Sequence, residues 1–218
     1  MYVGQAPLRR CLISSSAQTT MTTITPSTGC KSEELAGARK AAILYALGNT
    51  RSAIEEVESA LLEVQGETTM SAWAVLFEIH RAAKRLDAFE DLSRRFLDTF
   101  PAGRAPRWKS PALQAAGALA LEGDLLDARV VATIAKHAQD RKVVAIDMGR
   151  SGRIALEVAI ALCDLIRTLR LRGRRVLLVS MGEAGALLLE EFHTGEPLDF
   201  IRRRTLQHCS VLHERLAA

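Results

Sequence analysis

The stretch from residue 142 to residue 179 constrains the fold of this chain more than any other. It opens with an apolar, partly β-branched run at 143–146, which is typical of a buried strand. Apolar residues then recur at spacings of three and four over 154–169, which predicts an amphipathic helix that ends at Gly173. A second apolar run follows at 176–179. Strand, helix and strand in this order predict a parallel βαβ unit with a right-handed crossover.

A short polar segment lies between the first strand and the helix of this unit. It consists of Gly149, Arg150, Ser151, Gly152 and Arg153. Two glycines and a serine so close together predict a turn, because they tolerate unusual backbone angles. Asp147 precedes it at the C-terminal end of the strand, where α/β active sites often gather, but we interpret this carboxylate as a cap of the turn. The segment has neither the Gly-Lys-Ser/Thr of a P-loop nor the three glycines of a dinucleotide site.

Further elements flank the βαβ unit, and together they predict an α/β sandwich over residues 111–218. A strand is predicted at 118–121, closed by 122–124, then a helix at 128–139, a helix at 184–192, an edge strand at 198–201 and a last helix at 205–216. Basic residues crowd the end of the long helix and follow the edge strand. We interpret them mainly as complements of helix dipoles and as solubilising groups, with an acidic protein, phosphate or anionic membrane as the alternative contact.

The N-terminal half divides into three segments. Residues 1–32 are rich in Ser and Thr without acidic residues, which predicts a disordered tail, and the choice between Met1 and Met21 as the start of translation stays open. Residues 33–100 predict four helices, the first beginning at Ser32 as N-cap. Residues 101–110 carry two prolines and a glycine and predict a linker, in which Trp108 docks on one of the domains.

Composition excludes several classes of protein. The 218 residues are 48% hydrophobic and 25% charged, with a net charge of +4, so the chain can bury one large core or two small ones. No apolar run approaches the roughly 20 residues of a membrane span. The four cysteines are scattered, which indicates neither disulfides nor a zinc cluster and favours a cytoplasmic protein. No nucleic-acid motif is present, so we expect no nucleic-acid partner.

The helical half resembles tetratricopeptide repeats. The run 47–54, Leu-Gly-Asn-Thr-Arg-Ser-Ala-Ile, matches the turn and second helix of that family, and Ala53 and Ala88 take equivalent places in two hairpins. The second copy has Ala83-Lys84 where the family has its glycine. The resemblance implies a scaffold that binds peptides or proteins in a concave groove. Because two repeats are few, a four-helix cap that only shields its neighbour domain is the alternative.

The C-terminal half resembles the STAS domain, which anti-sigma factor antagonists share with the cytoplasmic tails of sulfate transporters. The match covers roughly residues 112–203. It rests on Leu-Ala-Leu-Glu-Gly-Asp-Leu at 119–125, on the strand 143–148 with its Asp, and on the spacing from Leu177 through Gly182 to the following helix. The resemblance implies an α/β sandwich with a mixed sheet that serves as a protein-binding module.

The phosphorylation switch of that family is altered in this chain. Antagonists carry Asp-Ser-Ser-Gly at the start of the domain's second helix, and residues 155–158 read Ala-Leu-Glu-Val there. Glu157 therefore replaces the phosphorylatable hydroxyl with a fixed carboxylate, which suits a helix N-terminus but cannot be switched. Ser151 in the preceding segment is an alternative target for phosphorylation, although a serine in a turn is explained by local hydrogen bonding.

The outward side of the long helix is the predicted binding face. With the apolar stripe turned inward, it carries Glu157, Ile160, Asp164 and Arg167 at spacings of three, four and three. A charged stripe around one exposed apolar side chain is typical of a partner-binding surface, and a solvated face with one tolerated isoleucine is the alternative.

Catalytic and metal-binding constellations are missing from the sequence. His208, Cys209 and His213 lie together near the C-terminus, but their spacing does not align them on one helical face, so we predict no metal site and no cofactor. We expect a protein-interaction adaptor or regulator without catalytic activity, whose partner is a protein of unknown identity. Two alternatives stay open: an accessory subunit of a membrane transport ATPase, and a nucleotide-binding regulator or small enzyme that uses residues 149–153.

Overall fold

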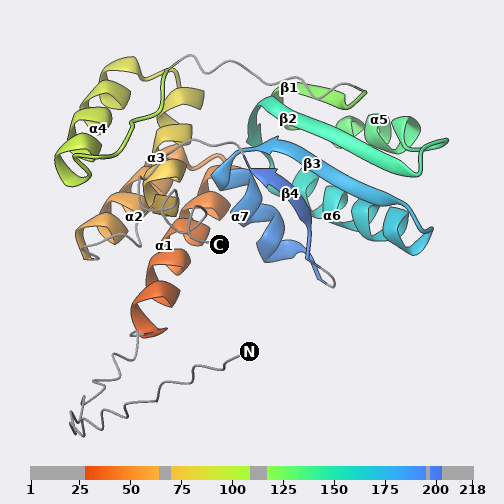
Figure 1. The fold of residues 1–218 in the computed structure, drawn as a ribbon, viewed down its shortest axis with the longest axis horizontal. Coiled ribbons are helices and arrows are strands. Elements are labelled where there is room, and N and C mark those ends of the chain that lie inside the picture. Colours follow the sequence, from red (N-terminus) through yellow and green to blue (C-terminus); the bar gives the residue numbers. More distant parts are fainter. Residues whose placement is uncertain (1–27, 64–69, 109–116, 195–196, 203–218) are drawn as a thin grey trace, which may run out of the picture.

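The computed structural model describes residues 28–63, 70–108, 117–194 and 197–202 and has a helical N-terminal region followed by an α/β part (Figure 1). The helical region consists of α1 (Thr28–Ala46), α2 (Thr50–Glu63), α3 (Met70–Ala82) and α4 (Leu86–Thr99). The four predicted helices are confirmed, although α1 begins at Thr28 rather than at Ser32. The rest of the predicted tail, residues 1–27, lies outside the described residues.

The two helical hairpins turn in the same way. Gly48, after α1, has φ of 88° and Lys84, after α3, has φ of 55°, so a lysine adopts the left-handed conformation in the second hairpin. In both turns the next amide reaches back five residues, from Asn49 to the Leu44 carbonyl and from Arg85 to the His80 carbonyl. This pattern is the Schellman motif, which satisfies the last carbonyls of a helix.

An aromatic cluster fills the helical region and holds the segment that leads to the α/β part. The rings of Trp73 and Phe96 lie 5.5 Å apart, and Phe77 packs edge-to-face on Phe89 at 5.0 Å. Trp108 packs on Phe89 at 5.1 Å, and the Arg81 guanidinium donates to the Arg107 carbonyl at 2.8 Å. The expected docking of Trp108 is thus confirmed, and its docking site is the helical region.

The α/β part has one four-stranded sheet with the strand order β1-β2-β3-β4. Its elements are β1 (Leu119–Leu125), α5 (Arg129–His137), β2 (Val143–Ile154), α6 (Leu156–Leu171), β3 (Arg175–Met181), α7 (Glu183–Phe192) and β4 (Asp199–Arg202). The three strand pairs are parallel, so the expectation of a mixed sheet is wrong for the described residues. A helix joins each strand to the next, so that all four strands begin at the same end of the sheet, as a parallel arrangement requires.

The βαβ unit packs as its periodicity predicts. Ile146 of β2 and Leu162 of α6 are fully buried, as are most apolar residues that alternate along β2 and β3. α6 packs against α5 on one side and α7 on the other, so that the three helices form one layer against the sheet. The edge strand predicted at 198–201 is confirmed as β4, whereas the helix predicted at 205–216 lies outside the described residues.

The predicted turn at 149–153 is wrong, because β2 continues through it to Ile154 and α6 begins only at Leu156. Strand β1 likewise continues to Leu125 instead of closing at residue 122. The two extensions pair with each other, Gly123 opposite Ser151 and Leu125 opposite Ile154, with two register shifts along the way. Bulges of this kind absorb glycines without ending a strand when a neighbour supplies hydrogen bonds.

Helix α7 joins the two regions. It contacts α6 within the α/β part and α1 and α3 in the helical region, and one continuous hydrophobic core runs through both. The strands run with their C-terminal ends toward the helical region, while the α5–β2 and α6–β3 connections lie at the far end (Figure 1). The sheet therefore has two opposite ends, one facing the helical region and one facing away from it.

Candidate functional site

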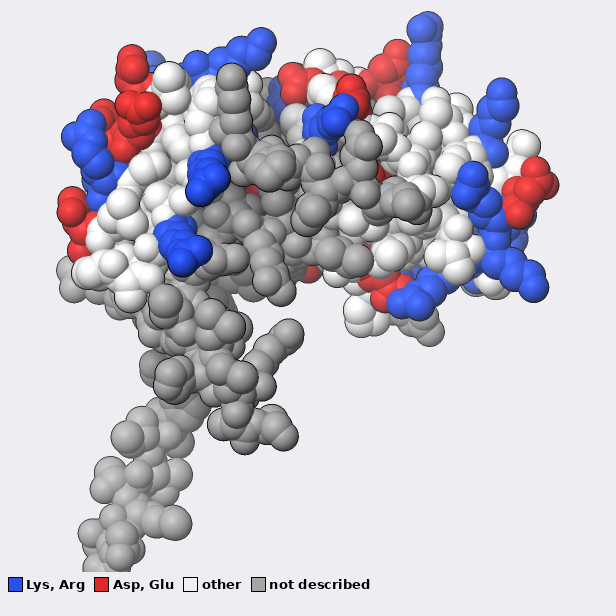
Figure 2. Space-filling model, turned by 45° about the horizontal axis from the view of Figure 1, so that its top comes forward, with Lys and Arg blue, Asp and Glu red and all other residues white. Residues whose placement is uncertain are grey.

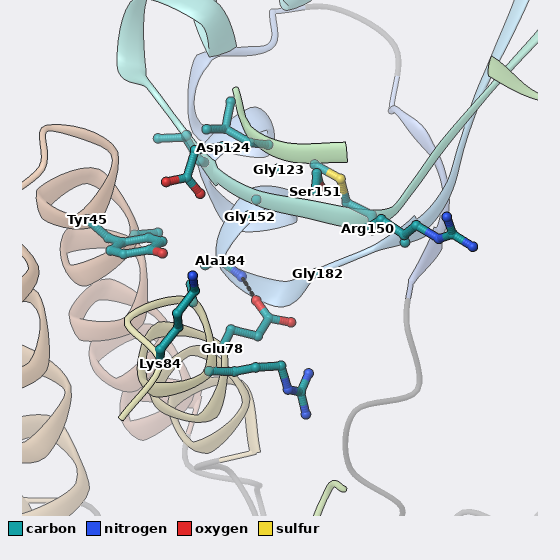
Figure 3. A pocket seen from close by; sticks show the side chains of 18 residues that line it. Tyr45, Glu78, Lys84, Gly123, Asp124, Arg150, Ser151, Gly152, Gly182 and Ala184 are labelled. Atoms are coloured by element: carbon teal, nitrogen blue, oxygen red, sulfur yellow. Dashed lines mark hydrogen bonds between the residues drawn. The ribbon is translucent and has the colours of Figure 1, made fainter. Parts of the chain in front are cut away.

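A cavity of about 320 Å³ lies between the helical region and the C-terminal ends of β1, β2 and β3. Figure 3 shows the side chains that surround it. The helical region contributes Tyr45, Glu78, Arg81 and Lys84, and the α/β part contributes Asp124, Arg150, Ser151 and backbone at Gly123, Gly149, Gly152 and Gly182. The C-terminal ends of parallel strands are where α/β proteins usually bind ligands.

Glycines let two carboxylates approach the backbone in this cavity. A β-carbon at Gly152 would collide with Oδ1 of Asp124, and one at Gly182 would lie 2.8 Å from Oε2 of Glu78. The Asp124 oxygen accepts a hydrogen bond from the Arg153 amide at 2.9 Å. The cavity wall thus depends on the absence of side chains at both glycine positions.

The Glu78 carboxylate caps the first turn of α7. Its two oxygens accept hydrogen bonds from the amides of Glu183 at 2.8 Å and Ala184 at 2.9 Å. Ser71, also on α3, donates its hydroxyl to the Glu183 carboxylate at 2.8 Å. The N-cap residue, Gly182, has no side chain to do this, so the helical region supplies the acceptor that α7 lacks.

Residues 149–152 form part of the cavity wall, and the side chains of Arg150 and Ser151 are already engaged. The Ser151 hydroxyl donates to the Met148 carbonyl at 2.8 Å, and Arg150 forms a 2.6 Å ion pair with Glu122 across the β1–β2 pair. Buried Asp147 accepts a hydrogen bond from the Gly149 amide at 2.8 Å, so its carboxylate bonds locally within β2, although the turn that it was expected to cap is not formed. These bonds hold the backbone at the cavity mouth.

The cavity has mixed charge and includes the neutral phenol of Tyr45. Burial raises the pKa of Tyr45 above its usual value, and the nearby Asp124 carboxylate adds to the effect. Tyr45 therefore stays a phenol at any physiological pH, and Figure 3 shows it beside Lys84 at the cavity. A phenol, an ammonium and a carboxylate offer hydrogen bonds to a small polar molecule.

The four residues predicted as a binding face are exposed on α6. Glu157 lies in the first turn, and Ile160, in the middle, keeps 41% of its surface exposed. Asp164 forms a 2.8 Å ion pair with Arg167. The opposite side of the helix, including Val158, is buried. The structure brings these four side chains onto one outward face of α6, separate from the segment 149–153, of which residues 149–152 line the cavity.

A metal-binding cluster and a membrane-spanning helix are both absent from the part of the chain that the structure describes. No group of three or more His, Cys, Asp or Glu side chains is arranged to hold a metal ion there. No helix in the described ranges has the length and apolar character to cross a membrane. His208, Cys209 and His213 lie outside these ranges.

Sequence reasoning missed the contribution of the helical region to the cavity. Tyr45, Glu78 and Lys84 lie far from residues 149–153 in the sequence, and no motif connects them. One signal was available: α7 begins after Gly182 without a Ser, Thr, Asn or Asp cap, so a remote acceptor was needed.

Comparison of the chain with protein-family models, curated proteins and solved structures finds no match.

Proposed function

We propose that this protein is a non-catalytic interaction module that binds a protein partner through the exposed face of α6. The observation that carries the proposal is Ile160, an aliphatic side chain 41% exposed between Glu157 and the Asp164–Arg167 ion pair. An apolar centre with a charged rim is the composition that distinguishes binding patches from ordinary surface.

The resemblance to STAS domains supports the same face. Antagonists of that family bind partners near the start of the corresponding helix, where Glu157 stands in this chain. A carboxylate there is permanent, so the interaction is expected to be constitutive rather than switched by phosphorylation. Ser151 is a poor substitute for the missing hydroxyl, because its oxygen is half-buried and bonded to the Met148 carbonyl.

The test is recovery of partners by the full chain in a pull-down followed by mass spectrometry. The Glu157→Arg/Ile160→Asp double variant is expected to lose the partner, while its free energy of unfolding changes by less than about 1 kcal/mol because both sites are exposed. Leu97→Asp is the matched control, since Leu97 is 42% exposed on α4. Retained binding by the folded double variant would remove α6 as the interface, and recovery of a transport ATPase would identify the accessory-subunit class.

A second candidate function is ligand-dependent regulation through the cavity. The observation that favours it is the position of this 320 Å³ space at the C-terminal ends of three parallel strands, with Lys84 and Tyr45 beside it. A thermal-shift screen with nucleotides tests it: a ligand of the cavity should raise Tm, and Lys84→Ala should reduce that shift. An equal shift in Lys84→Ala would place the ligand elsewhere.

A further inference from the structure

The end of the molecule furthest from the helical region is formed by two connections that are tied together. The Arg174 guanidinium, from the α6–β3 connection, donates to the carbonyls of Ala138 and Gln139 in the α5–β2 connection. The Arg175 amide donates to the Lys142 carbonyl at 2.9 Å. These bonds fix the relative position of the two connections, so their exposed side chains form one surface. We call it the amino-edge surface, because β2 and β3 begin there.

The amino-edge surface is strongly cationic. Positions 136–142 and 170–175 together hold seven Lys and Arg and a single acidic residue, Asp140. The exposed cations are Lys136, Arg141, Lys142, Arg172 and Arg175. Arg175 pairs with Asp199 at 3.1 Å, whereas Lys142 and Arg172 form no ion pair within the described ranges. Figure 2 shows basic side chains gathered at this end of the molecule, opposite the helical region.

Two large aliphatic side chains project from the same surface. Leu171, the last residue of α6, is 84% exposed between Arg170 and Arg172, and Val143, the first residue of β2, is 55% exposed beside Lys142. Leu171 has the largest exposed fraction among the large apolar residues that the structure describes. Register places Val143 opposite Arg175, so it lies at the same edge as the α6–β3 connection.

We propose that the amino-edge surface docks the protein on an anionic lipid membrane, with Leu171 and Val143 inserted among the headgroups and the surrounding cations on the lipid phosphates. Exposed aliphatics inside a cationic rim suit a lipid interface, which offers apolar depth and negative charge together. A nucleic acid would offer phosphate but nothing for the two aliphatics, and positions 136–142 and 170–175 hold no Phe, Tyr or Trp on which a base could stack.

Docking through this surface leaves the cavity free. The strands run from the amino-edge surface toward the cavity, so the cavity and the helical region point away from the membrane (Figure 1). On α6, Glu157 and Ile160 lie in the first half of the helix, whereas Arg167 lies one turn before Leu171 on the same side. The proposal is therefore independent of any ligand in the cavity, and it leaves the first half of the α6 face open to a protein partner.

The test is co-sedimentation of the full chain with vesicles of phosphatidylcholine alone or mixed with phosphatidylserine. We expect binding only to the mixed vesicles and its loss at high salt. Because one basic residue near an anionic surface contributes roughly a fivefold gain in affinity, Lys142→Glu/Arg172→Glu should weaken binding by about tenfold or more. Leu171→Ser should weaken binding by about fivefold, since it removes the inserted side chain.

Matched controls test whether any loss of binding is specific to the amino-edge surface or follows from removing any exposed charge or apolar side chain. Leu62→Ser removes a leucine that is 78% exposed on α2, and Arg51→Glu reverses an exposed charge on the same helix; both should leave vesicle affinity within about twofold. Far-UV circular dichroism and Tm confirm that each variant is folded. Absence of binding to the mixed vesicles, equal binding to both vesicles, or equal losses in controls and variants would overturn the proposal. Binding to duplex DNA but not to vesicles would also overturn it and assign the surface to nucleic acid.

Discussion

Removing the Glu78 carboxylate is the most direct test of how the two regions are joined. Its oxygens accept the amides of Glu183 and Ala184, the first two residues of α7, at 2.8 and 2.9 Å. Hydrogen bonds to a charged group contribute about 1.5–3 kcal/mol each, and they are not additive at one carboxylate. A helix cap alone contributes about 1 kcal/mol. We therefore expect Glu78→Ala to lower the free energy of unfolding by about 2–4 kcal/mol.

The measurement is urea unfolding followed by tryptophan fluorescence and far-UV circular dichroism. Glu78→Gln keeps one acceptor oxygen without the charge, so its loss should be about half that of Glu78→Ala. Glu55→Ala is the matched control: it removes an exposed carboxylate whose partner, Arg51, lies one helical turn away, and should cost less than about 0.5 kcal/mol. A loss in Glu78→Ala as small as that of the control would refute the reasoning.

Two further predictions concern the core. Ile146→Ala and Leu162→Ala remove fully buried side chains between β2 and α6 and should each cost about 2–5 kcal/mol in chemical unfolding; a loss below about 0.5 kcal/mol would contradict the packing. His80 is buried, and burial lowers its pKa from 6.5, with nearby Arg85 adding to the effect. The unfolded chain thus binds the proton more readily, so this contribution to stability is present above pH 6.5 and lost as pH falls through the folded pKa. His80→Gln should therefore show a flatter decline of stability between neutral and acidic pH, and an unchanged slope would assign the decline to other groups.

Periodicity predicted the elements whose environment is set by nearby sequence. The alternating and helical patterns over 143–179 gave β2, α6 and β3, because each pattern is local and its buried face is apolar. The same reasoning placed Ile160 on the outward side of α6, where it is exposed. The solvent-facing side of an amphipathic helix can be identified from its own sequence, without knowing which element packs against its apolar side.

Features that depend on a distant strand or helix were not predictable in this way. Residues 149–153 have turn composition but form strand, because β1 extends beside them and pairs Gly123 with Ser151. Lys84 takes the left-handed conformation without being a glycine, since the Schellman hydrogen bonds of the α3–α4 turn hold it there. The Glu78 cap on α7 joins residues more than a hundred positions apart, and only the capless start at Gly182 indicated that an acceptor was needed.

Helix α7 gives the final prediction, because it packs against both regions within the one continuous core. Its residues Ala186, Leu187, Leu188 and Leu189 are consecutive and all buried, which is the pattern of a helix covered on every side. α6 covers one side, and α1 and α3 cover another. A chain lacking residues 1–108 would therefore expose part of α7 to water and leave the Glu183 and Ala184 amides without their acceptor. We expect this fragment to bind a hydrophobic dye and to lose cooperative unfolding, whereas the full chain unfolds in one transition followed equally by fluorescence and circular dichroism. A truncated fragment that unfolds cooperatively, with the stability of the full chain, would show that α7 needs no cover from the helices.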